Sequence, residues 1–512
     1  MGPKALSGSS AGKRVRRASP RRSTPTRPTS RRSAPSDGQP SIASSHLGRS
    51  RPDAARAGSA TSPGRWPATR LRRRRRTTSP RATRSGRTWP LPEKTPATTV
   101  PAAPSDVNHA ERRLTSQSNA SSFIGRPVGA GDGLVDDIWF IHSPRFDEIA
   151  YPDECPFRTE RAGACLATVR RLGLIDESRA LVEPAPASRE ELRRLHEEGY
   201  LQTLERSESG QVDERSLWAG LGTPETPIFP GMVEYASLAS GATLLAARAV
   251  ADGRVRSAFN PSGGFHHAHA GRAAGFCYMN DVALACDELA RRGKRVLFLD
   301  LDVHHCDGVQ EFFYRRRDVM TLSLHQSGRT LFPFTGFEDD IGEGDGEGYS
   351  VNVPLPPGTD DVAYLRAFEA VAWPLIGVFD PDVLIVEWGM DTLAQDPLAQ
   401  LQLTNQTLAT IARRLMTLSK PTVHTGGGGY HVENTSRGWA LLWAEWTGAD
   451  TGEDLVAGLG GVLLGTGDWL GGLRDPPTII EPSVRAAVDA EVDAVIAHVK
   501  RRVFPRHGLN PS

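Results

Sequence analysis

Two acidic residues and a histidine follow one very apolar segment at every second position. Residues 296–299 form an unbroken apolar run, which is typical of a strand buried on both faces of a parallel sheet. Asp300, Asp302 and His304 come next, and alternate side chains of a strand share one face. Buried charges are costly unless they are paired or bind a metal. The pattern therefore favours a metal site over the alternative of a surface strand with solvated side chains.

Three other segments carry polar groups in glycine-rich loops or just after a predicted strand. Residues 263–269 (GGFHHAH) hold adjacent histidines, for which the alternative is a solvent-exposed loop. Asp391 follows the apolar run 383–386, and taken alone it would be explained by a turn. Residues 424–430 (HTGGGGY) contain four consecutive glycines, which are entropically expensive to order. This run indicates backbone that lies close to a ligand, with a flexible linker as the alternative.

Three of these residues together form a candidate ligand set for a metal. Asp302, His304 and Asp391 can supply three ligands and leave a fourth position open, which is the arrangement of a catalytic site. Two carboxylates and one imidazole suit Zn²⁺ and also accept Fe²⁺, Co²⁺ or Mn²⁺. A metal of this kind polarises a carbonyl group and acidifies bound water.

A hydrolase of this kind also needs a proton shuttle and a donor for the oxyanion. His266 or His267 can transfer the proton, because an imidazole titrates near neutral pH. Tyr430, at the end of the glycine run, can donate to the oxyanion. The residues alone therefore predict metal-dependent hydrolysis of an amide or an ester bond.

Apolar periodicity places these segments on an alternating series of strands and helices. Such alternation predicts an α/β protein, in which helices cover both faces of a parallel sheet and sites form at the carboxyl ends of the strands. The predicted strands are residues 137–142, 296–303, 319–325, 349–353, 383–387 and 421–425. The predicted helices lie within residues 156–172, 188–204, 241–250, 280–292, 309–316, 361–379 (interrupted near Pro374), 404–418, 433–446 and 484–499.

The net charge of +1 conceals two very different parts of the chain. Residues 1–100 contain 24 Lys or Arg and 3 Asp or Glu, whereas the rest contains 37 and 57. Residues 1–130 are rich in Ser, Thr, Pro and Arg without apolar periodicity, so we expect a disordered basic tail. Its arginine run at 72–76 can contact polyanions through charge. The alternatives are an organellar transit peptide, or a start near Val107 or Leu134 that leaves the tail untranslated.

The five cysteines form no CxxC pair and no disulfide framework. An odd number of cysteines in so long a chain indicates a reducing, intracellular compartment. No stretch reaches the roughly 18 consecutive apolar residues of a membrane span. We therefore expect a soluble, cytoplasmic protein that has no membrane partner, and the bias towards Arg, Ala, Gly and Pro suggests a bacterial source.

The motifs of the chain, in the order in which they occur, resemble those of the histone deacetylase family. They are most similar to its bacterial members, the histone-deacetylase-like amidohydrolases and acetoin-utilisation-type proteins, and the resemblance spans residues 134–504. It implies a deacetylase domain with the arginase/deacetylase fold: a single central parallel sheet with helices on both faces, and a narrow tube that leads to the metal. The motifs are GGFHHA, GFCYMND, DLDVHHCDGVQEFFY, SLHQS, FPFTG, the turn at 389–391 and GGGGYH.

The resemblance also implies roles for the metal and acid–base residues. Asp302, His304 and Asp391 match the zinc ligands of the family. His266 and His267 match its tandem catalytic histidines, with His267 as the general base and acid.

Further residues match the groups that support this chemistry. Asp300 and Asp307 match the carboxylate partners of the two histidines, which raise imidazole basicity and fix the tautomer. Tyr430 matches the tyrosine that binds the substrate carbonyl and its oxyanion. Family members also hold a structural K⁺ beneath the zinc. The residues that match its site are Asp300, Asp302, His304, Ser323 and Leu324.

The path of the substrate is implied in the same way. Phe276 and Phe332 match aromatic walls around the methylene stem of a lysine, and Gly275 matches the carbonyl that receives the amide N–H. Arg161 matches the arginine of an acetate exit channel. Leu398 stands where polyamine deacetylases that resemble this family carry an acidic gatekeeper. The resemblance therefore favours acetyl-lysine in proteins or peptides over acetylpolyamines and other small acylated amines.

Two residues depart from the pattern of the family. Glu387 and Trp388 stand where the family more often has Gln and a small apolar residue. An additional carboxylate so near the metal would change the metal preference or the proton inventory of the site.

Glu225 lies near the position where a rim Asp of the family grips the substrate backbone. A catalytically silent binding protein, whose basic tail contacts nucleic acid, is a third possibility that the intact ligands and Tyr430 disfavour.

Overall fold

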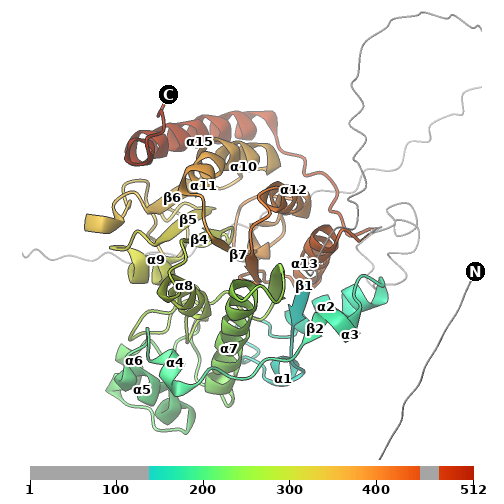
Figure 1. Cartoon of the computed structure of the whole chain (residues 1–512), viewed down its shortest axis with the longest axis vertical. Coiled ribbons are helices and arrows are strands. Elements are labelled where there is room, and N and C mark those ends of the chain that lie inside the picture. The colour runs from blue at the N-terminus through green and yellow to red at the C-terminus, as the bar shows by residue number, and fades with distance from the viewer. Residues whose placement is uncertain (1–137, 450–471) are drawn as a thin grey trace, which may run out of the picture. The chain divides into compact units, whose positions relative to one another are not determined.

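The apolar runs of the sequence form the strands of a single parallel sheet (Figure 1). The computed structural model describes residues 138–449 and 472–512. Neighbouring strands all pair in parallel, in the order β2-β1-β3-β8-β7-β4-β5-β6. The strands are β1 Ile138–Ile141, β2 Leu181–Val182, β3 Ser257–Asn260, β4 Val296–Asp300, β5 Val319–Gln326, β6 Ser350–Leu355, β7 Val383–Glu387 and β8 Thr422–Thr425.

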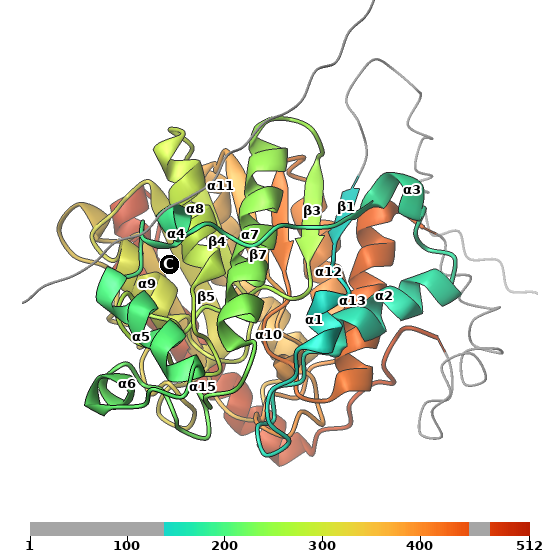
Figure 2. The same cartoon turned by 90° about the horizontal axis from the view of Figure 1, so that it is seen from below.

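The central strands are buried on both faces, which explains their unbroken apolar runs. In β4, Val296 and Phe298 belong to one hydrophobic core, whereas Leu297 and Leu299 belong to the other. Helices α7 and α8 cover the first core and lie in front of the strands in Figure 2, and α10 to α13 and α15 cover the second. Full burial of each such side chain contributes about 1.5–3 kcal/mol.

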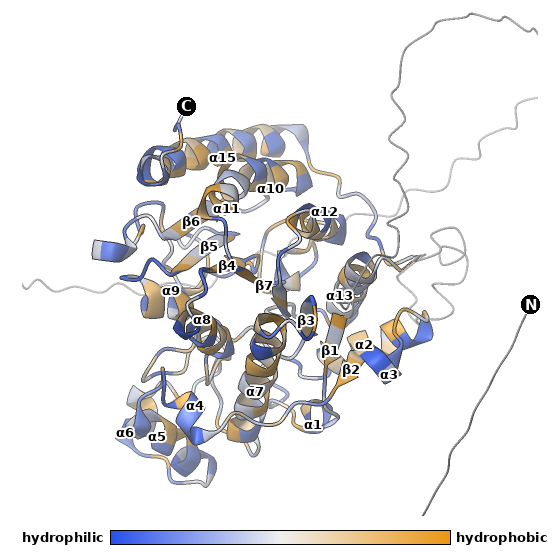
Figure 3. Cartoon of the chain, in the orientation of Figure 1, coloured by the Kyte–Doolittle hydropathy of each residue, from blue (hydrophilic) through white to orange (hydrophobic). Residues whose placement is uncertain are grey.

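The helices on the second face are amphipathic. Figure 3 shows hydrophobic and hydrophilic residues on α12 and α15, and α12 buries Leu408, Ile411, Ala412 and Leu415 at helical spacing. The helices are α1 Arg145–Glu148, α2 Arg161–Arg171, α3 Glu177–Ala180, α4 Arg189–Leu192, α5 Glu198–Glu208, α6 Glu214–Trp218, α7 Met232–Ala251, α8 Asp281–Arg291, α9 Asp307–Phe313, α10 Asp361–Ala367, α11 Trp373–Phe379, α12 Asn405–Met416, α13 Val432–Thr447 and α15 Pro482–Val503. Short 3₁₀ turns are Gly344–Gly346, Met390–Thr392 and Phe504–His507, and Phe368–Ala372 is a π-helical turn.

Two elements differ from the prediction in a way that matters for the site. β4 ends at Asp300, so Asp302 and His304 lie beyond the strand, and strand alternation is not what brings them together. Helix α7 begins at Met232, directly after Gly231, whose φ of 89° is the left-handed conformation that glycine adopts easily. The predicted start at residue 241 is therefore wrong.

The strand order brings four loops together at one edge of the sheet. β3, β8, β7 and β4 are neighbours, and each is followed by one of the segments selected from the sequence. Parallel strands end at the same edge, so the loops at 261–280, 426–431, 388–392 and 301–306 leave the sheet side by side. Such an edge is the usual place for a site in an α/β sheet, as predicted.

Three predictions from the sequence concern membrane insertion, the cysteines and the basic tail. Within the described residues, Asp361–Phe379 is the one helical segment long and apolar enough to cross a membrane, and half of it is buried. Its buried residues belong to the core beside the sheet, and its irregular turn precedes Pro374, where the interruption was predicted. All five cysteines are free and buried. The predicted basic tail, residues 1–130, lies outside the described residues.

Candidate active site and metal centre

The three predicted metal ligands come together at the carboxyl edge of the sheet. Asp302 and His304 follow β4, and Asp391 lies on the short turn after β7. The Nδ1 atom of His304 is 3.1 Å from Oδ1 of Asp302 and 3.1 Å from Oδ2 of Asp391. All three side chains are buried, and their ligand atoms lie within 4.8 Å of one another. This donor set fits a divalent metal such as Zn²⁺.

Backbone groups hold both carboxylates in place. Oδ1 of Asp302 accepts from the backbone N–H of His304 at 2.9 Å, and Oδ1 of Asp391 accepts from that of Val303 at 3.0 Å. The N–H of Gly428 donates to Oδ2 of Asp302 at 2.5 Å. A Cβ at Gly428 would overlap the carboxylate of Asp391, so the glycine run lies against the ligands themselves.

The charges of the three side chains depend on one another. Burial lowers the pKa of His304, but hydrogen bonds to Asp302 and Asp391 outweigh it and raise that pKa to about 10. Burial and the charge of Asp302 raise the pKa of Asp391 to about 7, although His304 opposes this shift. Burial also acts to raise the pKa of Asp302, but the hydrogen bond and the charge of His304 together lower it below its usual range. Two acids thus converge on one imidazole nitrogen, and a bound metal would take the place of a shared proton there.

His267 is paired with a carboxylate, as the sequence predicted. Its Nδ1 atom lies 2.7 Å from Oδ1 of Asp307, the first residue of α9. Burial and the nearby His266 lower the pKa of His267 to about 4, although Asp307 opposes this shift. The imidazole of His267 is therefore neutral at neutral pH, and Asp307 holds its proton on Nδ1.

The Nδ1 atom of His266 faces two carboxyl groups rather than the one that was predicted. Its Nδ1 atom is 3.5 Å from Oδ1 of Asp300 but only 3.1 Å from Oε1 of Glu387, and its Nε2 atom is 3.0 Å from Nε2 of His267. Glu387 is fully buried, and neither of its carboxyl oxygens has a hydrogen-bond partner among the described residues. Burial, followed by the charges of Asp300 and Asp302, raises the pKa of Glu387 well above its ordinary value. The sequence pointed to Glu387 but not to its closeness to His266.

A narrow cavity leads to these residues. Its volume is about 20 Å³, and its lining includes His266, His267, Phe276 and Tyr430. Phe276 lies 5.6 Å from the ring of Tyr430, measured between ring centroids. Phe157 also lines the cavity, and sequence reasoning missed it because no motif surrounds it.

Two further predicted substrate-binding residues, Phe332 and Gly275, pack around His267. The ring of Phe332 lies 5.0 Å from that of His267, although Phe332 does not belong to the lining of the cavity. A Cβ at Gly275 would overlap the ring of His267, so only glycine lets the backbone pass here.

The remaining predicted substrate residues lie around the glycine run. Arg161 is buried, and its Nη1 atom donates to the carbonyl of Gly429 at 2.8 Å. Leu398 is half-buried and does not line the cavity. Asp396 links it to Tyr430, because this carboxylate accepts from the backbone N–H of both residues. The carbonyl of Glu225 accepts from the backbone N–H of Phe276 at 3.1 Å.

The residues that match a K⁺ site include the metal ligands Asp302 and His304, and the others lie on β4 and β5. Asp300 is the register partner of Ser323, whose hydroxyl donates to Oδ2 of Asp300 at 2.6 Å. The backbone N–H of Asp302 donates to Oδ1 of the same carboxylate at 3.2 Å. The carbonyl of Leu324 accepts from the hydroxyl of Tyr364 at 3.2 Å. These oxygens suit a hard cation.

The fold and the site define an α/β protein that has a donor set for a divalent metal, beside paired histidines, at the carboxyl edge of its sheet. Comparisons with known proteins then identify the family. The histone deacetylase domain matches residues 155–446, more than half of the chain. The chain belongs to the histone deacetylase family and is a deacetylase of the hydrolase class, as predicted.

Individual relatives agree with this assignment. The chain is 39% identical over 327 residues to the acetoin utilization protein AcuC of Bacillus subtilis, a match that covers 62% of this chain and 84% of that protein. It is 39% identical over 308 residues to histone deacetylase 8 of Xenopus tropicalis, covering 60% of this chain and 82% of that protein.

Solved structures confirm the predicted arginase/deacetylase fold. An HDAC homolog from Aquifex aeolicus superimposes with a TM-score of 0.62 at 34% identity, covering 69% of this chain and 99% of that chain. An HDAC homolog complexed with SAHA gives a TM-score of 0.63 at 35% identity, covering 70% of this chain and all of that chain.

Proposed function

We propose that the protein removes acetyl groups from lysine side chains of proteins or peptides. We further propose that Asp302, His304 and Asp391 hold Zn²⁺, for which Fe²⁺ is the alternative. The main support is that these three buried donors converge directly beside a histidine pair. When bound, the metal would polarise the amide carbonyl and activate the attacking water.

His267 is the proposed general base and acid. Asp307 holds the proton on Nδ1, which leaves Nε2 able to accept a proton from the attacking water. The same nitrogen then delivers a proton to the leaving amine. The Nε2 atom of His266 lies 3.0 Å from that of His267, and Asp300 and Glu387 face the other nitrogen of His266.

Tyr430 and the cavity walls position the substrate in this proposal. Burial, together with the charges of Asp391 and Asp302, raises the pKa of Tyr430 well above its ordinary value, so its hydroxyl stays protonated and can donate to the oxyanion. Phe276 and Phe332 enclose the methylene stem, and the carbonyl of Gly275 accepts the amide N–H. Arg161 attracts the acetate that is released.

The neutral side chain of Leu398 favours acetyl-lysine over acetylpolyamines. A polyamine carries further positive charges that an acidic residue at this position would attract. Leu398 offers no such charge, and Asp396, its nearest acidic neighbour along the chain, is already engaged by two backbone N–H groups.

A substrate panel with metal analysis tests the proposal. We expect the purified protein to contain one zinc per chain and to deacetylate acetyl-lysine peptides faster than acetylpolyamines. Asp391→Asn should lose the metal, whereas His267→Ala should keep the metal and lose turnover. Full turnover by His267→Ala would refute the assigned role, and faster turnover of acetylpolyamines would refute the assigned substrate.

We also propose that Asp300 and Ser323 contribute to a K⁺ site and that the protein has a cytoplasmic location.

We propose that residues 134–504 form the catalytic unit. The basic tail is therefore dispensable for chemistry, and it contacts polyanions through charge. A variant that begins near Asp132 should retain kcat and lose salt-dependent binding to DNA. Loss of kcat in that variant would contradict the boundary.

A further inference from the structure

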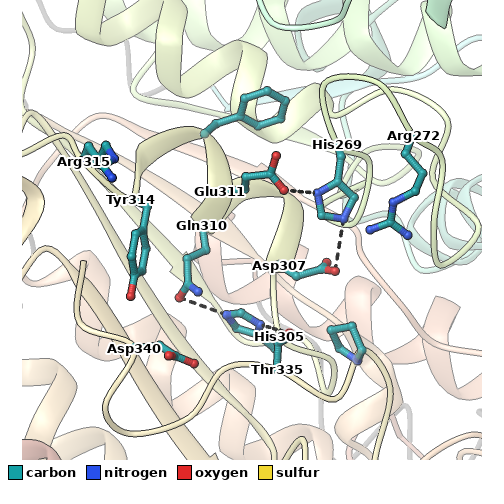
Figure 4. Close-up of a pocket in the computed structure, with 12 residues that line it drawn as sticks. His269, Arg272, His305, Asp307, Gln310, Glu311, Tyr314, Arg315, Thr335 and Asp340 are labelled. Atoms are coloured by element: carbon teal, nitrogen blue, oxygen red, sulfur yellow. Dashed lines mark hydrogen bonds and ion pairs between the residues drawn. The ribbon is translucent and has the colours of Figure 1, made fainter. Parts of the chain in front are cut away.

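A second cavity lies beside Asp307, the carboxylate partner of His267 (Figure 4). Its volume is about 630 Å³, and it shares no lining residue with the narrow cavity that holds His267. Asp307, the partner of His267, lines the second cavity together with His269 and Glu311. The His267–Asp307 pair therefore separates the narrow cavity from a wider, solvent-facing one.

Four side chains form a continuous series from the narrow cavity to the surface. His267 contacts Oδ1 of Asp307, and Oδ2 of the same carboxylate lies 3.4 Å from Nε2 of His269. The Nδ1 atom of His269 is 2.5 Å from Oε2 of Glu311, as Figure 4 shows. His267 is only 5% exposed, whereas the side chain of Glu311 is 60% exposed.

The local sequence explains why these groups meet. Asp307 and Glu311 are four residues apart on α9, so their side chains lie on one face of the helix. His269 follows His267 by two residues in the loop after β3, and its ring lies between the two carboxylates. The backbone N–H of Gly308 donates to Oδ1 of Asp307 at 3.0 Å, which leaves His269 as the group that faces Oδ2.

His269 carries positive charge more readily than an ordinary histidine. Burial lowers the pKa of His269, but Asp307 and Glu311 outweigh this and raise it, with Arg272 in opposition. Each ring nitrogen faces one carboxylate, as a cation requires. The other charged or titratable side chains that line the cavity are Arg272, His305, Tyr314, Arg315 and Asp340.

We propose that His269 is a positioning residue of the deacetylase, which holds the outer oxygen of Asp307 and connects the His267–Asp307 pair to Glu311 at the surface. The inference rests on the proposed role of His267. The ion pair at the outer oxygen opposes rotation of the Asp307 carboxylate away from the imidazole that it orients, and outer partners of this kind are part of a catalytic arrangement. A charge on His269 also competes with His267 for the negative charge of Asp307.

Two variants of the full-length, zinc-loaded protein test this role. His269→Gln removes the charge, and we expect kcat to fall about tenfold, the lower end of the effect of outer partners in metal sites, with KM unchanged. The ionisation of His269 should also disappear from the pH profile of kcat. Glu311→Gln should shift that ionisation to lower pH, because the carboxylate that raises the pKa of His269 is gone.

His498→Gln is the matched control. His498 pairs with Asp339 at 3.1 Å on the surface and does not line either cavity. We expect its kcat and pH profile to match the wild type. Wild-type kcat and pH profiles in both His269→Gln and Glu311→Gln would overturn the inference. If thermal unfolding shows that His269→Gln is not folded, the exposed Glu311 variant decides alone.

A readout without substrate separates this inference from the proposed function. The Nδ1 proton of His267, held by Asp307, gives an NMR signal in the zinc-loaded protein. We expect that signal to move in His269→Gln and to stay in place in His498→Gln, whichever substrate the enzyme takes. An unmoved signal would overturn the inference, whereas a wild-type protein that fails to turn over acetyl-lysine would refute only the proposed function.

Discussion

Gly428→Ala tests whether close backbone packing sets the geometry of the metal ligands. An alanine Cβ at this position would overlap Oδ2 of Asp391 and would also lie 2.9 Å from Oδ2 of Asp302. Because non-bonded heavy atoms pack at about 3.5–4 Å, the carboxylate of Asp391 must move by more than about 1 Å. A misplacement of about 1 Å in a catalytic arrangement costs on the order of 100-fold in rate, or about 2.7 kcal/mol of transition-state stabilisation.

The assay compares kcat/KM on an acetyl-lysine peptide, zinc content and thermal unfolding in Gly428→Ala and in a control. Gly377→Ala is the control, because a Cβ at this exposed position of α11 meets nothing within 4 Å. We expect Gly377→Ala to be fully active and about 0.5–1 kcal/mol more stable, since alanine is a better helix former. Gly428→Ala should lose about 100-fold in kcat/KM. Full zinc content and near wild-type kcat/KM in Gly428→Ala would refute the reasoning.

Three further perturbations address the proton inventory and the metal. Tyr430→Phe should lower kcat by about 10²–10³-fold, as loss of one oxyanion donor does. Tyr349 packs on His507 away from the site, so the control Tyr349→Phe should leave kcat unchanged. Burial raises the pKa of Glu387 above 4.5, so the folded state binds the proton of this carboxyl group more tightly than the unfolded state does. The protonated group therefore contributes stability at low pH, and this contribution is lost as pH rises through the pKa of the folded state. Urea unfolding of metal-free Glu387→Gln should therefore show higher stability than the wild type at alkaline pH but not near pH 4, and equal stability at both would contradict this. A zinc chelator should abolish turnover and lower the melting temperature by mass action, with zinc restoring both; turnover that survives complete zinc removal would contradict the metal assignment.

Local pattern predicted much of the framework. β7 has the bounds that its apolar run indicated, and Asn280 caps α8 by accepting from the N–H of Ala283 at 2.8 Å. Ser188 and Glu191, three positions apart at the start of α4, form a capping box. These features depend on residues within a few positions of one another, which a single sequence displays directly.

The end of β4 could not be predicted from alternation alone. Asp302 and His304 keep the polar spacing of a strand but leave the sheet, because their backbone N–H groups donate to the carboxylates of Asp300 and Asp302 rather than to a neighbouring strand. Their side chains contact Asp391 and Gly428. Those partners lie about ninety to one hundred and thirty positions further along the chain, and no local pattern reports on them.

Contacts between side chains from different loops could not be predicted from the sequence either. The pairing of His269 with Asp307 and Glu311 depends on how the loop after β3 folds over α9. The closeness of Glu387 to His266 depends on the order in which β3, β8 and β7 assemble. Each contact is a product of topology, so it becomes visible only when the strands are placed.

The position of β8 in the sheet also bears on how the chain is made. β8 pairs with β3 on one side and β7 on the other, and among the strands of residues 138–449 and 472–512 it alone joins β2-β1-β3 to β7-β4-β5-β6. During synthesis, both groups of strands leave the ribosome before residues 422–425 do, so the sheet cannot close until this short strand pairs with both. Such long-range pairing makes closure a late step, and a chain cut before residue 422 would expose two unpaired edges to aggregation.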